Sequence, residues 1–132
     1  MLLYKEKPDI VCLTETKCGT AEAYHYLNIK GYQSAVYNRN NFGGGAALLI
    51  ADKFFTEAVI INTKYVDENV EFVGTRIVFG NKDFTFIAYY NPPWRKPDRK
   101  LLKYVDENFD NYLILGDINC KTSPWDIQMK IF

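Results

Sequence analysis

Two apolar segments of this sequence each end in side chains that can bind a metal ion. The first, residues 10–14, is followed by Glu15, and the second, residues 112–116, is followed by Asp117 and Asn119. Such runs, without polar alternation, predict strands covered on both faces, and ligands gather at the carboxyl ends of such strands in open α/β sheets. Two carboxylates and an amide offer the hard oxygen ligands that Mg²⁺ prefers. The pattern indicates phosphate-ester chemistry.

Each of these residues also has an ordinary structural interpretation. Glu15 can be a solvated strand end, because acids are common at such positions. Asp117 and Asn119 are two residues apart, so an extended segment would point both to one side, and Gly116 before them allows close approach of a backbone or a phosphate. They can equally cap a loop, because Asp and Asn bond their own backbone. The spacing alone leaves both interpretations open.

A third apolar segment ends at Tyr90, which the Pro-Pro bend at residues 92–93 would hold at the same edge. A phenol in that position can donate a hydrogen bond to a phosphate oxygen. The alternative is a tyrosine that only fills a loop. The basic residues that follow, beside an aromatic side chain, form either a phosphate clamp or a solvated helix start: Arg95, Lys96, Arg99 and Lys100.

The elements that must position these side chains mix helices and strands in one α/β domain. Strands are expected at residues 10–14, 32–37, 46–51, 59–62, 70–79, 84–90 and 112–116, with a turn at 80–83. Helices are expected at residues 1–7, 20–29 and 98–108. The glycines at 43–45 lack the lysine of a P-loop, so we interpret them as a strand entry that needs close packing.

Composition excludes several classes of protein. The 132 residues fit one domain, and 16 basic residues balance 16 acidic ones, so no long-range field favours a polyanion or a membrane. The start has no signal-peptide core, and the longest apolar run, residues 46–51, is too short to span a bilayer. We expect a soluble, intracellular protein. The cysteines Cys12, Cys18 and Cys120 lack zinc-ligand spacing and are expected to be reduced thiols.

Taken in order, four segments resemble the endonuclease/exonuclease/phosphatase family: residues 8–17, 43–50, 90–93 and 116–119. The Thr-Glu-Thr form at residues 14–16, the glycines after Arg39, and Trp125 six residues beyond Asn119 are most similar to the apurinic-endonuclease-like domain of non-LTR (LINE-type) retrotransposons. The resemblance covers nearly the whole chain. It implies a four-layer α/β sandwich of two mixed β-sheets flanked by helices.

The resemblance also implies site residues, a cofactor and partners. Glu15 matches the magnesium-binding glutamate and Tyr90 the tyrosine that contacts the scissile phosphate. Asp117 matches the aspartate that orients or deprotonates the attacking water, and Asn119 the asparagine that helps to position it. The implied cofactor is Mg²⁺, with Mn²⁺ as an alternative, and the implied partner is DNA. Further candidates for substrate binding are Arg39, Arg95, Lys96 and Trp125.

The sequence departs from the family pattern at both ends. The first strand with its asparagine and the C-terminal strands with an aspartate and a Ser-Asp-His motif are missing, and His25 lies in the wrong part of the order to replace that histidine. We therefore expect residues 1–132 to form part of such a domain, with severely reduced activity. Whether the chain is an enzyme stays open, because a non-enzymatic retroelement remnant is the main alternative. Another is the same fold acting on a phosphoinositide, a sphingolipid or an RNA tail.

In a functional retrotransposon, a chain of this kind would be part of a polyprotein with other enzymes. The resemblance implies a reverse transcriptase domain in the parent polyprotein and a nuclear location for a functional element. No membrane partner is expected. The expected activity of the parent is magnesium-dependent nicking of target DNA.

Overall fold

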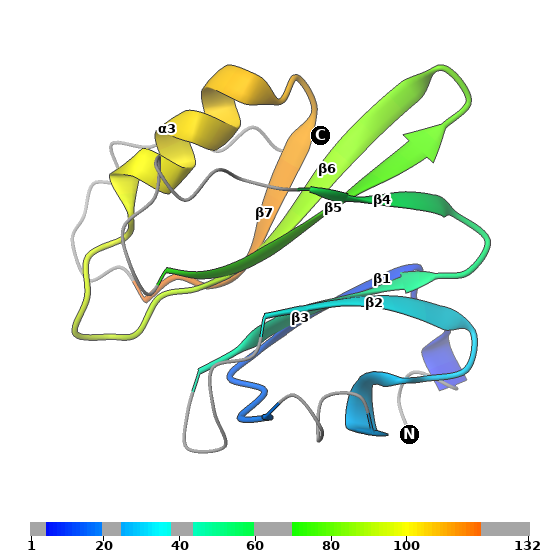
Figure 1. Ribbon diagram of the computed structural model, residues 1–132, viewed down its shortest axis with the longest axis horizontal. Coiled ribbons are helices and arrows are strands. Elements are labelled where there is room, and N and C mark those ends of the chain that lie inside the picture. Colours follow the sequence, from blue (N-terminus) through cyan, green and yellow to red (C-terminus); the bar gives the residue numbers. More distant parts are fainter. Residues whose placement is uncertain (1–4, 20–24, 38–43, 60–69, 120–132) are drawn as a thin grey trace.

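In the computed structural model, which describes residues 5–19, 25–37, 44–59 and 70–119, two β-sheets pack face to face (Figure 1). The first sheet is antiparallel and contains, in spatial order, β1 (Ile10–Thr14), β3 (Ala46–Ala51) and β2 (Tyr32–Tyr37). The second contains β4 (Phe55–Val59), β5 (Glu71–Phe79), β6 (Lys82–Tyr90) and β7 (Tyr112–Asp117). Only its β6–β7 pair is parallel. The α/β sandwich expected from the sequence is confirmed.

The parallel pair requires a crossover, which α3 (Arg99–Asn108) supplies. Asp98 caps the helix, because its carboxylate accepts hydrogen bonds from the backbone N–H groups of Lys100 (2.8 Å) and Leu101 (3.0 Å). The expected helix at 98–108 is thus confirmed, with residue 98 as its cap. Leu101 and Val105 are four residues apart and share one buried face, which packs on the outer side of the second sheet.

Alternation along β6 separates two hydrophobic clusters. Ile87 and Tyr89 face outward and pack under α3, whereas Ala88 faces the first sheet and packs with Leu48 and Ile50 of β3. Successive side chains of a strand point to opposite faces. Tyr90, the next residue, therefore faces the first sheet.

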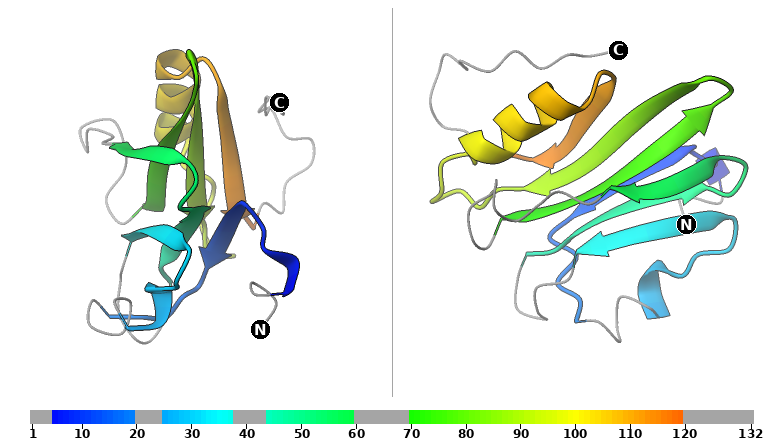
Figure 2. Two further views of the ribbon diagram at one scale, coloured as in Figure 1. Left: turned by 90° about the vertical axis from the view of Figure 1, so that its right-hand side faces the viewer. Right: turned by 45° about the horizontal axis from the view of Figure 1, so that its top comes forward.

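The strands β1 and β7 are edge strands in the described part of the chain, and they lie along the same side of the sandwich (Figure 2). We expected both to be covered on both faces, and this was wrong. Every residue of β1 is only partly buried, and Gly116 and Asp117 of β7 are exposed. An edge strand has a neighbour on one side only, so its apolar side chains are less covered than those of β3, where Ala46 to Ile50 are buried.

Some boundaries also differ from expectation. The strand expected at 59–62 is β4, which ends at Val59, and residues 60–62 lie outside the described ranges. The turn expected at 80–83 is a two-residue turn, because Phe79 already pairs with Lys82. Of the helix expected at 20–29, residues 25–27 are helical and 20–24 are outside the described ranges, as are residues 1–4 of the expected helix at 1–7.

Two smaller expectations concern membranes and thiols. No helix in the described residues has the length and apolar character that a membrane crossing requires. Cys12 and Cys18 are free thiols, and Cys120 lies outside the described residues. Burial raises the pKa of the Cys12 thiol to about 11.

Candidate active site

Three of the sequence-predicted residues come together where strands of both sheets end. Tyr90 is the last residue of β6 and lies opposite Asp117, the last residue of β7. Its phenol donates a hydrogen bond to Oε1 of Glu15, the residue after β1, over 2.8 Å. Side chains at the ends of strands from two different sheets thus come together in one place.

The face of the second sheet beneath this place carries a row of three polar side chains. Glu71 lies opposite Tyr90 in the β5–β6 pair, and Tyr90 lies opposite Asp117 in the β6–β7 pair. Directly opposed residues of neighbouring strands point to the same face. Because Tyr90 faces the first sheet, Glu71 and Asp117 do so as well. Glu15 approaches this row from the other sheet.

The surroundings of Tyr90 keep its phenol protonated. Only 4% of its surface is exposed. Burial, the hydrogen bond to Glu15 and the negative charges of Glu15, Glu71 and Asp117 raise the pKa of Tyr90 to about 12. At neutral pH the side chain is therefore a hydrogen-bond donor, which is the form that can bind a phosphate oxygen.

The backbone that carries Glu15 is held in an unusual conformation. Glu15 has φ +52° and Lys17 has φ +53°, both in the left-handed region. A residue other than glycine costs about 1–3 kcal/mol there and persists only when its surroundings hold it, which is common at functional sites. One constraint is the backbone N–H of Lys17, which donates to the carbonyl of Gly44 over 3.0 Å.

The glycines that precede β3 provide that hold. Gly44 and Gly45 have φ values of +71° and +95°. A Cβ at Gly44 would overlap the Glu71 carboxylate, and a Cβ at Gly45 would overlap the Thr16 hydroxyl. The sequence interpretation of a strand entry that needs close packing is confirmed for these two residues, and Gly43 lies outside the described ranges.

Glu71 is a site residue that the sequence analysis missed. Its side chain is 3% exposed and accepts a hydrogen bond from the backbone N–H of Gly45 over 3.2 Å. A signal was present, because Glu71 is an acid at the start of a mostly apolar strand. A two-residue turn at Gly80 and Asn81 would have paired it with Tyr90.

The loop after β7 is folded back rather than extended. Asn119 has φ +45°, and its side-chain amide donates to the main-chain carbonyl of Asn91 over 2.9 Å. Of the two interpretations that the sequence left open, an extended segment and a loop, the loop is the one observed, because β7 ends at Asp117. Asn119 anchors the loop to the end of β6 instead.

Asn91, also missed from the sequence, fixes this loop from the other side. It is 1% exposed. Its backbone N–H donates to the carbonyl of Asp117 (2.9 Å), and its amide donates to the carbonyls of Ile118 (3.0 Å) and Arg95 (2.6 Å). Together with the hydrogen bond from Asn119, these contacts connect the loop after Asp117 to the loop after Tyr90.

Gly116 allows the backbone of β6 to approach β7 closely. Its φ is +137°, and a Cβ there would overlap the carbonyl oxygen of Tyr89. Of the two interpretations offered from the sequence, close approach of a backbone is the one observed.

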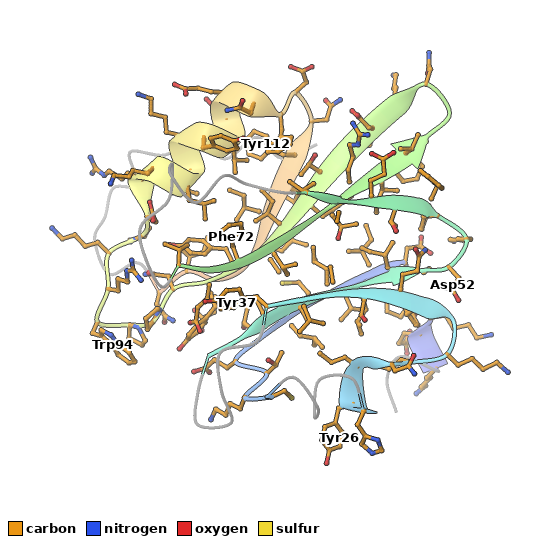
Figure 3. The ribbon with its side chains drawn as sticks, in the orientation of Figure 1. Tyr26, Tyr37, Asp52, Phe72, Trp94 and Tyr112 are labelled. Carbon is orange, nitrogen blue, oxygen red and sulfur yellow. The ribbon has the colours of Figure 1, made fainter. Side chains whose placement is uncertain are left out.

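The basic segment after Tyr90 borders the same end of the molecule. Trp94 is 81% exposed on a turn closed by the backbone N–H of Arg95, which donates to the carbonyl of Pro92 over 3.0 Å. Figure 3 labels Trp94 at the tip of this turn. The neighbouring cations Lys96, Arg99 and Lys100 are exposed, and Arg95 is half-buried. The other predicted substrate contacts, Arg39 and Trp125, lie outside the described residues.

The donor set suits a hard divalent cation. No group of three His, Cys, Asp or Glu side chains in the described residues forms a protein-only metal site. Mg²⁺ does not require one, because it keeps several waters and uses one or two carboxylates with phosphate oxygens of the substrate. Glu15 and Asp117 are exposed carboxylates, and the negative charges of both raise the pKa of Tyr90. They fit such an open site.

Several solved structures have a fold similar to that of this chain. The catalytic domain of human Nocturnin with bound sulfate matches with a TM-score of 0.58 at 14% identity, over 92% of this chain and 55% of that one. D. rerio TDP2 complexed with a single-strand DNA product matches with a TM-score of 0.62 at 14% identity (92% and 52%). An AP endonuclease from Archaeoglobus fulgidus matches with a TM-score of 0.59 at 19% identity (97% and 53%).

These likenesses establish the fold. The chain has the endonuclease/exonuclease/phosphatase fold and spans about half the length of the solved structures that it matches. No family model matches the sequence, and no curated protein matches it.

Proposed function

We propose that the chain acts as a magnesium-dependent phosphodiesterase that nicks DNA, as the endonucleases of non-LTR retrotransposons do. The observation that carries this proposal is the hydrogen bond from Tyr90 to Glu15 beside Asp117, at the strand ends of both sheets. Structures that share the fold support it, since they include an AP endonuclease and a TDP2 with single-strand DNA product. The sulfate bound to Nocturnin is an anion with the shape of phosphate.

The residues divide the work as follows. Glu15 would hold the cation, and Asp117, which lies opposite Tyr90, would act on the attacking water. When bound, Mg²⁺ supplies positive charge that stabilises the phosphoryl oxygens during in-line displacement. Tyr90 stays protonated and, in place of its hydrogen bond to Glu15, would donate to a non-bridging phosphate oxygen. Asp117 orients the attacking water and accepts its proton, on a loop that Asn119 and Asn91 hold in place.

The exposed segment after Tyr90 favours nucleic acid as the substrate. A single-stranded base stacks on an exposed indole, and lysine and arginine side chains neutralise the neighbouring phosphates. Trp94 offers such a ring, and Lys96 and Arg99 are exposed close to it in sequence. Assignment to the retrotransposon endonucleases is more specific than assignment to DNA hydrolysis, and it rests on the motifs around Glu15, Arg39 and Trp125. It extends the proposal to a reverse transcriptase partner and a nuclear location.

The test is conversion of supercoiled plasmid to the nicked form, with Mg²⁺, with Mn²⁺ and with a chelator. Glu15→Ala and Asp117→Asn should each lower the nicking rate by about 10²- to 10⁴-fold, as expected for loss of a cation ligand or an acid/base group. Asp110→Asn is the matched control, because Asp110 is an exposed carboxylate just before β7, at the opposite end of that strand from Asp117. Equal rates for all four proteins would remove these side chains from the mechanism.

Assays with lipid phosphoesters and a measurement of cation binding, run beside plasmid nicking, separate the alternatives. Hydrolysis of a phosphoinositide or sphingolipid without plasmid nicking would assign the site to another phosphoester. Failure to bind any divalent cation, with no hydrolysis of any substrate, would favour the non-enzymatic remnant.

A further inference from the structure

We propose that Glu71 is a positioning residue. Through the glycine pair Gly44-Gly45 it fixes residues 15–17, which follow β1 and carry the Glu15 carboxylate, and so sets the affinity of the site for its divalent cation. The inference rests on the proposed function only in taking Glu15 as a cation ligand. Glu71 itself does not touch the cation in this proposal. It acts through the backbone that Glu15 depends on.

Glu71 is built into the second sheet but makes its contacts to a segment of the first. It is the first residue of β5, it is buried, and its Oε1 accepts the backbone N–H of Gly45. Its carboxylate lies directly against Gly44, where a Cβ would overlap it. A buried carboxylate requires hydrogen-bond partners, so these contacts hold Glu71 and the glycine pair in one arrangement.

The glycine pair in turn holds the two residues that follow Glu15. Gly44 accepts the backbone N–H of Lys17 over 3.0 Å, and Gly45 lies against the hydroxyl of Thr16. Glu15 and Lys17 both have left-handed φ angles, which need support from outside their own segment. The glycine pair provides that support.

These contacts form a continuous ring that connects the two sheets. Glu71 and Tyr90 are neighbours on one face of the second sheet, and Tyr90 donates to Glu15. From Glu15 the backbone leads through Lys17 and Gly44 back to Glu71. Glu15 is therefore held at its carboxylate oxygen by Tyr90 and, through the backbone of Lys17, by the Glu71 clasp, which we define as Glu71, Gly44 and Gly45.

The decisive measurement is cation affinity, read from the electron paramagnetic resonance signal of free Mn²⁺ titrated with the full chain and no substrate. Glu71→Ala should weaken Mn²⁺ binding about 10- to 100-fold, the usual effect of removing a residue that orients a metal ligand. Glu71→Gln should retain most of the affinity, because the amide oxygen still accepts the Gly45 N–H. Unchanged affinity in Glu71→Ala would overturn the proposal. Equal loss in both variants would also overturn it, because Glu71 would then act by its charge or as a direct ligand.

Glycine variants test the clasp without touching a carboxylate. Gly44→Ala should weaken Mn²⁺ binding to a similar degree, since its Cβ would push Glu71 away. Gly80→Ala is the matched control, because Gly80 also has positive φ but nothing lies within 4 Å of its Cβ position. If Glu71→Ala does not fold, the contrast between these two variants decides. Equal affinity in Gly44→Ala and Gly80→Ala would count against the clasp.

The nicking assay keeps this inference separate from the proposed function. A wild-type chain that binds Mn²⁺ but nicks no DNA, with Glu71→Ala weakened, would support the clasp and contradict the nuclease. A wild-type chain that nicks DNA, together with unchanged Mn²⁺ affinity in Glu71→Ala, would support the nuclease and contradict the clasp. In an active chain, raising the Mg²⁺ concentration should restore the nicking rate of Glu71→Ala and not that of Asp117→Asn.

Discussion

Glu15 and Tyr90 are 75 positions apart in the sequence and belong to different sheets, yet the phenol of one donates to the carboxylate of the other over 2.8 Å. Glu15 is exposed, whereas Tyr90 is buried. The buried phenol therefore gives an exposed carboxylate a fixed partner. Any variant that moves one sheet relative to the other should disturb this pair.

Tyr90→Phe removes the donor and keeps the ring. We expect the nicking rate to fall about 10²- to 10³-fold, the range seen when one donor to a developing oxyanion is lost. The unfolding free energy should fall by about 1.5–3 kcal/mol, the value of a hydrogen bond to a charged group. Urea unfolding and plasmid nicking measure the two effects. Tyr112→Phe is the control, since it removes a phenol that donates to Asp106 and should leave the nicking rate unchanged.

Stability should fall at alkaline pH. Burial and hydrogen bonds to carboxylates raise the pKa values of Tyr90 and Tyr112 from 10.0 to about 12, and burial raises that of Cys12 from 9.0 to about 11. These groups hold their protons more tightly in the folded chain, so the unfolded chain loses protons first as the pH rises. Their contribution is complete below about pH 9 and is lost progressively up to about pH 12. Urea midpoints across this window measure it, and Tyr90→Phe/Tyr112→Phe should show a shallower decline.

Gly116→Ala should destabilise the chain. The added Cβ would meet the Tyr89 carbonyl, and alanine is strained at φ +137°. We expect a loss of at least about 2 kcal/mol in unfolding free energy, because both the strain and the overlap must be relieved by moving β7 from β6. Gly80→Ala, at φ +59° in open space, should lose about 1 kcal/mol. Equal losses would show that backbone strain alone accounts for Gly116.

Much of the site could be predicted from one sequence because strand ends are visible in apolar patterning. The strands ending near Glu15, Tyr90 and Asp117 were placed within a few residues of their observed bounds. Alternation along β6 and a two-residue hairpin turn also determine which face Tyr90 occupies and which residue lies opposite it. Glu71 was therefore within reach of sequence reasoning once the turn length was known.

Other parts depend on contacts that local sequence does not encode. The left-handed φ angles at Glu15 and Asn119 occur in segments held by partners distant in sequence, since Gly44 bonds to Lys17 and Asn91 bonds to Asn119. The partial burial of β1 follows from its place at the edge of a sheet, which its apolar sequence does not reveal. The start of β4 before Val59 was missed because residues 55–58, which are mostly exposed, have little apolar patterning.

Trp94→Ala tests whether the exposed indole binds nucleic acid. We expect affinity for a single-stranded oligonucleotide to fall by about 1–3 kcal/mol, the value of one base stacked on an aromatic ring, while stability stays unchanged because the side chain is 81% exposed. Trp94→Phe should retain part of the affinity. Tyr26→Ala is the matched control, since Tyr26 is 66% exposed and lies on a different part of the surface (Figure 3). Fluorescence anisotropy at two salt concentrations measures the affinities, and equal binding by Trp94→Ala and the wild type would remove this ring from the substrate contact.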